Sequence, residues 1–304
     1  MLSLIKNRVT LLGSVKRLCS SNLHFEPAMP QLKDIKLNQI DKAVFNVELN
    51  RPNQRNAFTM DLWRELKAVI DYLAYHPPCR SIVLSAAGKS FTAGIDLKEA
   101  FSKLTALTQD DSIDIARRSR KIMILISQMQ DCFTALEKCP KPIVSAIHSH
   151  CIGAGIDLIL ASDIRYASKD SVFSIKEVDV GMTADVGTLN RIQKVVANDS
   201  LTRELAYTGR NFYADEALSY GLVSRLFDTP DQCKQAAIET AILISQKSPI
   251  AVQGTKVVLN HARNHSIEDS LEFIKYWNAS QLITEDIVKA NMGSKEKGSQ
   301  FSDV

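Results

Sequence analysis

The sequence lacks the features that mark metal-bound, disulfide-linked or membrane-spanning proteins. Its six cysteines include no C-x-x-C pair, so we expect reduced thiols that pack as small hydrophobic side chains in a reducing compartment. No apolar run approaches the roughly 18 residues that a membrane-spanning helix needs. Internal repeats, heptad arrays and low-complexity blocks are also absent. These absences favour a globular protein without a metal cluster or a membrane span.

Acidic residues are absent from the first 25 residues, which are basic, contain serine and are mildly amphipathic. The basic side chains there are Lys6, Arg8, Lys16 and Arg17. These properties are typical of a mitochondrial transit peptide, and a frayed basic tail is the alternative. A secretory signal is disfavoured because Val9–Val15 is short and interrupted. We therefore expect residues 1–33 to be a transit peptide and linker and the protein to reach the mitochondrial matrix. A peroxisomal destination is less expected, because the C-terminus lacks Ser-Lys-Leu.

The rest of the chain is nearly neutral. Because the whole chain carries a formal charge of +3 and the first 25 residues carry +4, the remainder carries −1. This balance disfavours an extended nucleic-acid-binding surface, so no nucleic-acid partner is expected. A length of 304 residues with 45% hydrophobic content is ample for a large buried core.

Apolar patterns predict strands that alternate with helices early in the chain and helices alone at its end. Ile40–Asn50 alternates as a strand does, and residues 59–75 carry an apolar stripe with helical spacing. A longer helical pattern covers Ile115–Lys138. Three late helices are expected, at residues 231–246, 249–262 and 266–291. This order favours an α/β layer followed by a C-terminal helical region.

Three short stretches of the chain form a joint pattern. They are Asn50-Arg51-Pro52-x-x-Arg55-Asn56-Ala57, Ser90-Phe91-Thr92-Ala93-Gly94-Ile95-Asp96-Leu97 and Gly153-Ala154-Gly155-x-Asp157. Together they resemble the crotonase (enoyl-CoA hydratase/isomerase) superfamily, over about residues 35–290. The resemblance implies an α/β fold with a ββα spiral core at residues 34–228, a C-terminal helical region for trimerisation at 229–292 and a disordered tail at 293–304. It also implies an acyl-CoA substrate, no metal or redox cofactor, and a homotrimer or a dimer of trimers.

By the same resemblance, two backbone N–H groups, those of Ile95 and Ala154, would form an oxyanion hole. Removing a proton next to a thioester places negative charge on the thioester oxygen, and fixed N–H donors stabilise that charge. The implied substrate groove is lined by Ala93, Gly94, Ile95, Asp96, Leu97 and Ala154. The alternative is that both stretches are ordinary glycine-containing turns.

Three acids are the candidate catalytic residues. The segments Lys176–Gly181 and Ala184–Thr188 are most similar to superfamily members that move two conjugated double bonds. The resemblance then implies isomerisation of 3,5-dienoyl-CoA to 2,4-dienoyl-CoA in β-oxidation of unsaturated fatty acids. Asp185 would take the C2 proton, Glu177 would protonate C6, and Asp157 would tune or position the other two. Two acids are expected because one carboxylate could hardly serve both ends of the diene. Burial and mutual repulsion would raise their pKa values.

Other interpretations stay open. An enoyl-CoA hydratase would use Asp157 and Glu177 to add water and would usually have a small residue in the loop of Asp185. A non-catalytic homologue would bind RNA or scaffold a complex. Glu177 and Asp185 could also be loop caps or solvent-exposed acids. Candidate contacts for the CoA phosphates are Arg55, Arg117, Arg118, Lys121, Lys256 and Lys289, and His148 and His150 are expected to be packing or capping residues.

Overall fold

The computed structural model describes residues 27–292 and 301–304. The predicted transit peptide at 1–26 and the part of the predicted tail at 293–300 lie outside the described residues. The larger sheet has the strand order β1-β2-β3-β4-β6-β9, and the smaller has the order β5-β7-β8. The strands are β1 (Ile35–Asp41), β2 (Val44–Leu49), β3 (Ser81–Ala86), β4 (Ile143–Ile147), β5 (His150–Ile152), β6 (Ile164–Ser168), β7 (Val172–Ser174), β8 (Phe212–Tyr213) and β9 (Arg225–Phe227). In the larger sheet β1 is antiparallel to β2 and the other pairs are parallel.

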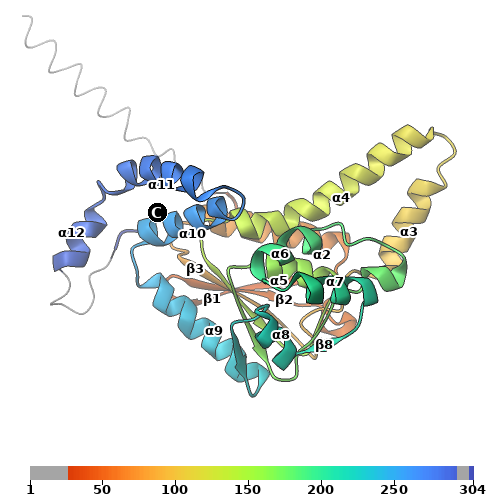
Figure 1. Cartoon of the computed structure of the whole chain (residues 1–304), viewed down its shortest axis with the longest axis horizontal. Coiled ribbons are helices and arrows are strands. Elements are labelled where there is room, and N and C mark those ends of the chain that lie inside the picture. Colours follow the sequence, from red (N-terminus) through yellow and green to blue (C-terminus); the bar gives the residue numbers. More distant parts are fainter. Residues whose placement is uncertain (1–26, 293–300) are drawn as a thin grey trace, which may run out of the picture.

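Helices surround both sheets (Figure 1). They are α2 (Met60–Tyr75), α3 (Leu97–Thr108), α4 (Ile115–Lys138), α5 (Ala154–Leu160), α6 (Thr188–Val195), α7 (Asp199–Thr208), α8 (Ala214–Tyr220), α9 (Pro230–Ser245), α10 (Pro249–Ala262), α11 (Ile267–Gln281) and α12 (Glu285–Met292), with short 3-10 turns η1 (Pro52–Gln54) and η2 (Glu177–Val180). The ends of α3 and α4 project from the body on one side, and α10, α11 and α12 lie on the other (Figure 1). No helix in the described part of the chain is long and apolar enough to span a lipid bilayer.

The core lies on both faces of the larger sheet. Every residue of β3 and β4 is buried, as expected for parallel strands covered on both sides. On one face, α2 buries an apolar stripe that includes Leu62, Leu66 and Val69. On the other face, α9 places small buried side chains against the valines of β2, β3 and β4. Helix α9, which the sequence analysis assigned to the C-terminal helical region, therefore packs directly on the sheet.

Several predicted elements agree with the structure and others need correction. Helix α4 has the predicted bounds Ile115–Lys138, and α2 begins after Thr59, whose side chain accepts a hydrogen bond from the Leu62 N–H. The predicted strand Ile40–Asn50 instead contains the tight turn between β1 and β2. The predicted helix at 266–291 divides into α11 and α12. Helix α3 was not predicted.

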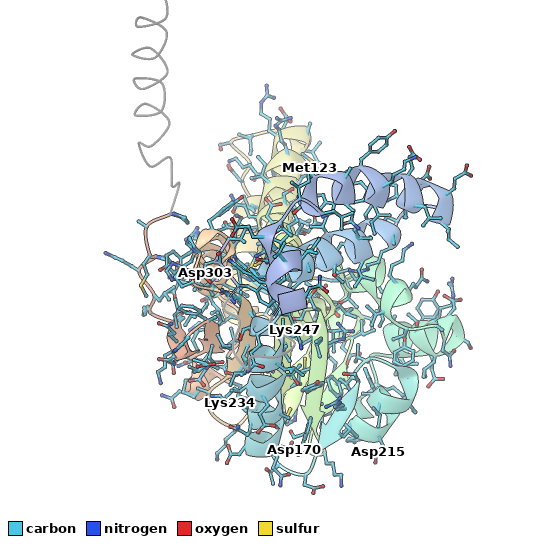
Figure 2. The ribbon with its side chains drawn as sticks, turned by 90° about the vertical axis from the view of Figure 1, so that its left-hand side faces the viewer. Met123, Asp170, Asp215, Lys234, Lys247 and Asp303 are labelled. Atoms are coloured by element: carbon cyan, nitrogen blue, oxygen red, sulfur yellow. The ribbon has the colours of Figure 1, made fainter. Side chains whose placement is uncertain are left out.

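The last described residues contact the body of the protein. Arg80 forms an ion pair with Asp303 at 2.6 Å, and the Lys141 Nζ donates a hydrogen bond of 2.8 Å to the Val304 carbonyl oxygen. Figure 2 shows Asp303 against the body. Lys141 is 1% exposed, so this contact satisfies a buried cation. The predicted disorder of the tail therefore does not hold for residues 301–304.

Candidate active site

A buried asparagine fixes the first of the two turns at the site. Asn56 is fully buried, its Oδ1 accepts a hydrogen bond from the Arg51 N–H, and its Nδ2 donates to the carbonyl oxygens of Ala87 and Ser90 at 2.8 and 2.9 Å. The Asn56 carbonyl oxygen in turn accepts a hydrogen bond of 2.8 Å from the Thr92 hydroxyl. These bonds hold the segment that follows β3 against the turn after β2.

The Ile95 amide lies in that segment. Gly94 has φ +91°, which glycine adopts without strain. The carbonyl oxygen of Gly94 accepts a hydrogen bond from the Phe58 N–H, and the Asp96 N–H donates to the Phe58 carbonyl oxygen. Among the described residues, the Ile95 N–H between them has no hydrogen-bond acceptor. It remains available to a ligand.

The Ala154 amide lies in the second turn, between β5 and α5. Gly153 has φ +52°, and Ala154 is the first residue of α5, so its N–H has no acceptor within the helix. The two turns touch: a Cβ atom on Gly94 would lie 2.9 Å from the Ile152 carbonyl oxygen and 3.8 Å from the Ala154 nitrogen. The structure thus brings the two predicted amide donors together.

Asp157 occupies the buried first turn of α5. Its side chain is 1% exposed, and its Oδ1 accepts a hydrogen bond of 2.5 Å from the N–H of Thr188, the first residue of α6. Burial raises the pKa of Asp157 to about 6, while the hydrogen bond from Thr188 and the positive charge of Arg191 act in the opposite direction. Asp157 therefore joins the N-terminal ends of two helices.

Glu177 lies beside the Ala154 turn. A Cβ atom on Gly153 would be 3.4 Å from Glu177 Oε1. Glu177 Oε2 is buried and has no hydrogen-bond partner among the described residues. Burial, followed by the negative charges of Asp157 and Asp185, raises the pKa of Glu177 to about 7. A carboxyl group of this kind carries a proton for much of the time near neutral pH.

Asp185 lies in the loop between η2 and α6. Its side chain is partly buried, and burial raises its pKa. Its backbone carbonyl oxygen accepts a hydrogen bond of 2.6 Å from Gln130 Nε2 on α4. Because its charge raises the pKa of Glu177, the two predicted proton-transfer residues belong to one electrostatic cluster. Both residues are partly buried.

The remaining groove residues have varied roles. The Ala93 N–H donates to the Arg55 carbonyl oxygen, so Ala93 helps to hold the turn. Asp96 Oδ1 accepts a hydrogen bond from the Glu99 N–H and caps α3. Leu97, the first residue of α3, is 44% exposed.

Most of the basic residues proposed for CoA phosphates are already paired. Lys256 is buried and donates to Asp163 Oδ2 at 2.7 Å, as well as to two backbone carbonyl oxygens. This excludes it as a phosphate contact. Four others form ion pairs with neighbouring acids: Arg117, Arg118, Lys121 and Lys289. Arg55 is exposed and remains a candidate.

Within residues 27–292 and 301–304, no group of three or more His, Cys, Asp or Glu side chains could hold a metal ion. His148 Nε2 is 3.1 Å from the Gly88 carbonyl oxygen, and His150 Nδ1 is 3.0 Å from the Ser149 hydroxyl. Both histidines make the local contacts expected of capping residues.

Three polar side chains near the acids were not indicated by the sequence motifs. Gln130 and Glu137 come from α4, and Arg191 comes from α6. Gln130 binds the Asp185 loop, whereas Glu137 and Arg191 pair with each other at 3.0 Å. These contacts join residues 54 and 55 positions apart, and no local sequence pattern indicates them.

The mainly parallel sheet, the neighbouring turn amides and the clustered acids agree with what the crotonase pattern in the sequence implies. Residues 39–303 match the enoyl-CoA hydratase/isomerase family, and the chain belongs to that family. The predicted superfamily membership is thus confirmed.

Named relatives refine this assignment. The chain is 47% identical to the mitochondrial Delta(3,5)-Delta(2,4)-dienoyl-CoA isomerase of Mus musculus, over 87% of this chain and 80% of that protein. It is 41% identical to the peroxisomal enzyme of the same name from Arabidopsis thaliana, over 82% of this chain and 89% of that protein. The crystal structure of an enoyl-CoA hydratase from Bacillus anthracis matches with a TM-score of 0.79 and 25% identity, over 89% of this chain and 99% of that one.

The close packing of the two turns can be tested at Gly155. A Cβ atom there would lie 2.6 Å from Thr92 Cγ2 and 3.1 Å from Cys151 Sγ, so Gly155→Ala should lower the free energy of unfolding by about 1–3 kcal/mol. Thr92→Ser removes Cγ2 and keeps the hydroxyl. In a protein that also carries Thr92→Ser, Gly155→Ala should therefore lower the free energy of unfolding much less. Urea denaturation of the wild type, the two single variants and the double variant measures this difference. If the two substitutions lower the free energy of unfolding by strictly additive amounts, the predicted contact is wrong.

The buried carboxyl of Glu177 predicts a pH-dependent stability. Its pKa rises from an ordinary 4.5 to about 7 in the folded protein, so folding favours the protonated form, and this contribution is lost as the pH rises from 4.5 through 7. Relative to the wild type, Glu177→Gln should therefore gain stability over this range, reaching about 3 kcal/mol at pH 8. Chemical denaturation at pH 5, 6, 7 and 8 checks this, with Glu268→Gln on the exposed face of α11 as the control. A difference that does not change with pH would refute the assignment.

Proposed function

We propose that this protein isomerises 3,5-dienoyl-CoA to 2,4-dienoyl-CoA in the β-oxidation of unsaturated fatty acids. The observation that carries the proposal is the Glu177 carboxyl, buried without a partner next to the Gly153–Ala154 turn and close enough to Asp185 to be affected by its charge. An acid and a base next to paired backbone donors suit a proton shift along an acyl thioester. The names of the relatives support the same reaction.

The proposed reaction removes one proton from the substrate and adds another to it. Asp185 removes a proton from C2, and the resulting negative charge on the thioester oxygen is stabilised by the N–H groups of Ile95 and Ala154. The electron pairs shift so that the bonds C3=C4 and C5=C6 become C2=C3 and C4=C5. Glu177 then donates its proton to C6. The excess proton on Asp185 returns to Glu177 through solvent, so each turnover leaves the protein unchanged.

Protonation states support this division of roles. With a pKa of about 7, Glu177 is protonated in a large fraction of molecules at neutral pH and can act as the acid. Asp157 and Asp185 favour that state, because their negative charges oppose ionisation of Glu177. The proposed reaction neither oxidises nor reduces the substrate, so it requires no redox cofactor, and backbone amides supply the stabilisation that a metal ion would otherwise give.

An enoyl-CoA hydratase is the alternative reaction. It would need Asp157 and Glu177 to act together on a water molecule. Asp157 is 1% exposed and its Oδ1 already accepts the Thr188 N–H, so it is poorly placed to take a proton from water. The presence of Asp185 in the cluster further favours the isomerase.

The proposal extends to assembly and location. The groove between α10, α11 and α12 is lined mainly by apolar side chains, with exposed Leu259, Leu271 and Leu282 on these helices or next to them. Such a surface supports burial against other copies of the chain, in a homotrimer or a dimer of trimers. The basic first 25 residues support a mitochondrial matrix location, which import of the full chain into isolated mitochondria would test.

The reaction predicts a direct optical assay. Purified protein should shift the ultraviolet absorbance of a 3,5-dienoyl-CoA, because only the product is conjugated with the thioester. Asp185→Asn and Glu177→Gln should each lower kcat by about 10²-fold or more. Asp179→Asn is the matched control, because Asp179 is exposed and pairs with Lys176 on the same turn as Glu177. Hydration of crotonyl-CoA without dienoyl isomerisation, or nearly full activity of Asp185→Asn, would overturn the proposal.

The assembly also predicts a measurable mass. Sedimentation equilibrium of the mature chain should give three or six times the mass of one chain. Leu271→Glu, at an exposed apolar position of α11, should shift that mass towards the monomer if this surface is buried between copies. A monomeric wild type would contradict the proposed assembly.

A further inference from the structure

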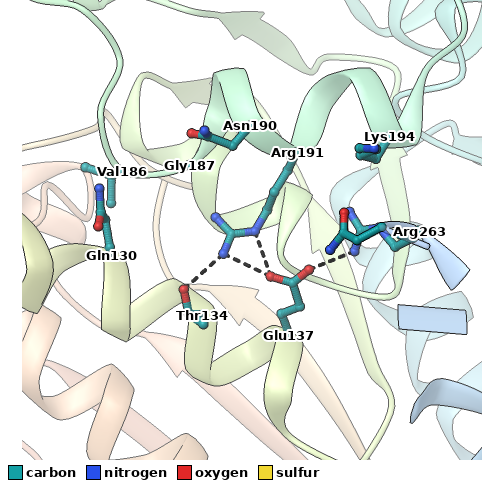
Figure 3. A pocket seen from close by; sticks show the side chains of 10 residues that line it. Gln130, Thr134, Glu137, Val186, Gly187, Asn190, Arg191, Lys194 and Arg263 are labelled. Atoms are coloured by element: carbon teal, nitrogen blue, oxygen red, sulfur yellow. Dashed lines mark hydrogen bonds and ion pairs between the residues drawn. The ribbon is translucent and has the colours of Figure 1, made fainter. Parts of the chain in front are cut away.

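An ion-pair cluster lies behind the Asp185 loop, on the wall of a cavity of about 360 Å³ (Figure 3). Arg191 on α6 donates from Nε to Glu137 Oε2 at 3.0 Å and from Nη2 to the Thr134 hydroxyl at 3.1 Å. The other oxygen of Glu137 accepts a hydrogen bond of 3.0 Å from Arg263, which follows α10. Glu137 therefore holds two guanidinium groups from different parts of the chain.

The guanidinium of Arg191 lies across Gly187. A Cβ atom at Gly187 would overlap Arg191 Nη1, and Gly187 has φ +139°. The absence of a side chain at this position lets Arg191 fold back over the peptide that connects Asp185 to α6. Arg191 is thus fixed against the loop of one catalytic candidate.

The same guanidinium affects a second acid. The peptide next to Gly187 ends in the Thr188 N–H, which donates to Asp157 Oδ1. The positive charge of Arg191 lowers the pKa of Asp157, in opposition to burial. Within the described part of the chain, Glu177 and Cys151 also interact with the charge of Asp157. Of Arg191, Glu177 and Cys151, Arg191 alone is a cation.

We propose that Arg191 is a positioning residue for the reaction: it holds the Gly187–Thr188 peptide in place and keeps Asp157 ionised. The negative charge of Asp157 then opposes ionisation of Glu177 and keeps the acid supplied with its proton. Glu137 sets the strength of this effect, because it neutralises part of the Arg191 charge. The inference rests on the proposed function, since it assigns the state of the acids in that reaction.

Charge-changing variants of the full chain test the inference through opposite pH shifts. Arg191→Gln should raise the pKa of Asp157, so that less negative charge opposes ionisation of Glu177. The alkaline limb of the kcat profile, where Glu177 loses its proton, should therefore move to lower pH, with a loss of roughly tenfold or more in kcat at pH 7 and a smaller change in KM. Glu137→Gln leaves the Arg191 charge uncompensated and should move the same limb to higher pH. Relative to Arg191→Gln, Arg191→Lys should restore the pH of the limb but only part of kcat. An ammonium group keeps the positive charge but cannot make the several hydrogen bonds of a planar guanidinium.

Lys194→Gln is the matched control, because Lys194 is exposed on the same helix and lines the same cavity. It should leave the profile unchanged. A limb that Arg191→Gln does not move, or that Lys194→Gln moves equally, would overturn the inference. If Arg191→Gln does not fold, the opposite displacement in Glu137→Gln and the restored limb in Arg191→Lys decide the question.

The wild-type assay separates this inference from the proposed function. Isomerisation by the wild type with an unshifted Arg191→Gln profile would reject the positioning role alone. Hydration of a 2-enoyl-CoA by the wild type would reject the proposed function. The same profiles would then be measured on hydration, which would also use Asp157 and Glu177.

Discussion

Close backbone contact between two glycine-containing turns is the constraint on which the rest of the site depends. Gly94 packs against the Ile152–Ala154 segment at a distance that leaves no space for a side chain. This contact places the unpaired N–H of Ile95 next to that of Ala154, at the start of α5. Buried hydrogen bonds of the Asn56 and Thr92 side chains hold the first turn in place. The donors are thus held by buried hydrogen bonds before any substrate binds, which is the condition for electrostatic stabilisation without reorganisation.

The acids around this pair obtain different properties from one environment. Asp157 is the most buried but accepts the Thr188 N–H and faces Arg191, which limits the rise in its pKa. Glu177 is less buried but has a carboxyl oxygen without a partner and two negative neighbours, so its pKa rises to about 7. One group is therefore suited to carry charge and the other to carry a proton. The proposed proton transfer requires such a separation between an acid and its electrostatic neighbour.

Local sequence patterns predicted the parts of this arrangement that depend on neighbouring residues. The positions of α2 and α4 follow from the helical spacing of their apolar residues. The family resemblance added the three acids and the two amides, and family membership is confirmed. The roles of these residues remain predictions.

Contacts between distant segments were not predictable in this way. Helix α9 packs on the sheet through Cys233, Ala237 and Ala241, which are too small to give a strong apolar stripe. The Glu137 contacts with Arg191 and Arg263 span 54 and 126 residues. Lys256 resembled a surface cation in the sequence, yet it is buried against Asp163. In each case the burial of the side chain is a tertiary property.

A crystal structure with a non-isomerisable acyl-CoA analogue would test the central claim most directly. The account predicts that the thioester oxygen lies about 2.7–3.1 Å from both the Ile95 and the Ala154 nitrogen atoms, with C2 next to Asp185 and C6 next to Glu177. A thioester oxygen bound away from either nitrogen, or a C6 position beyond the reach of Glu177, would contradict it.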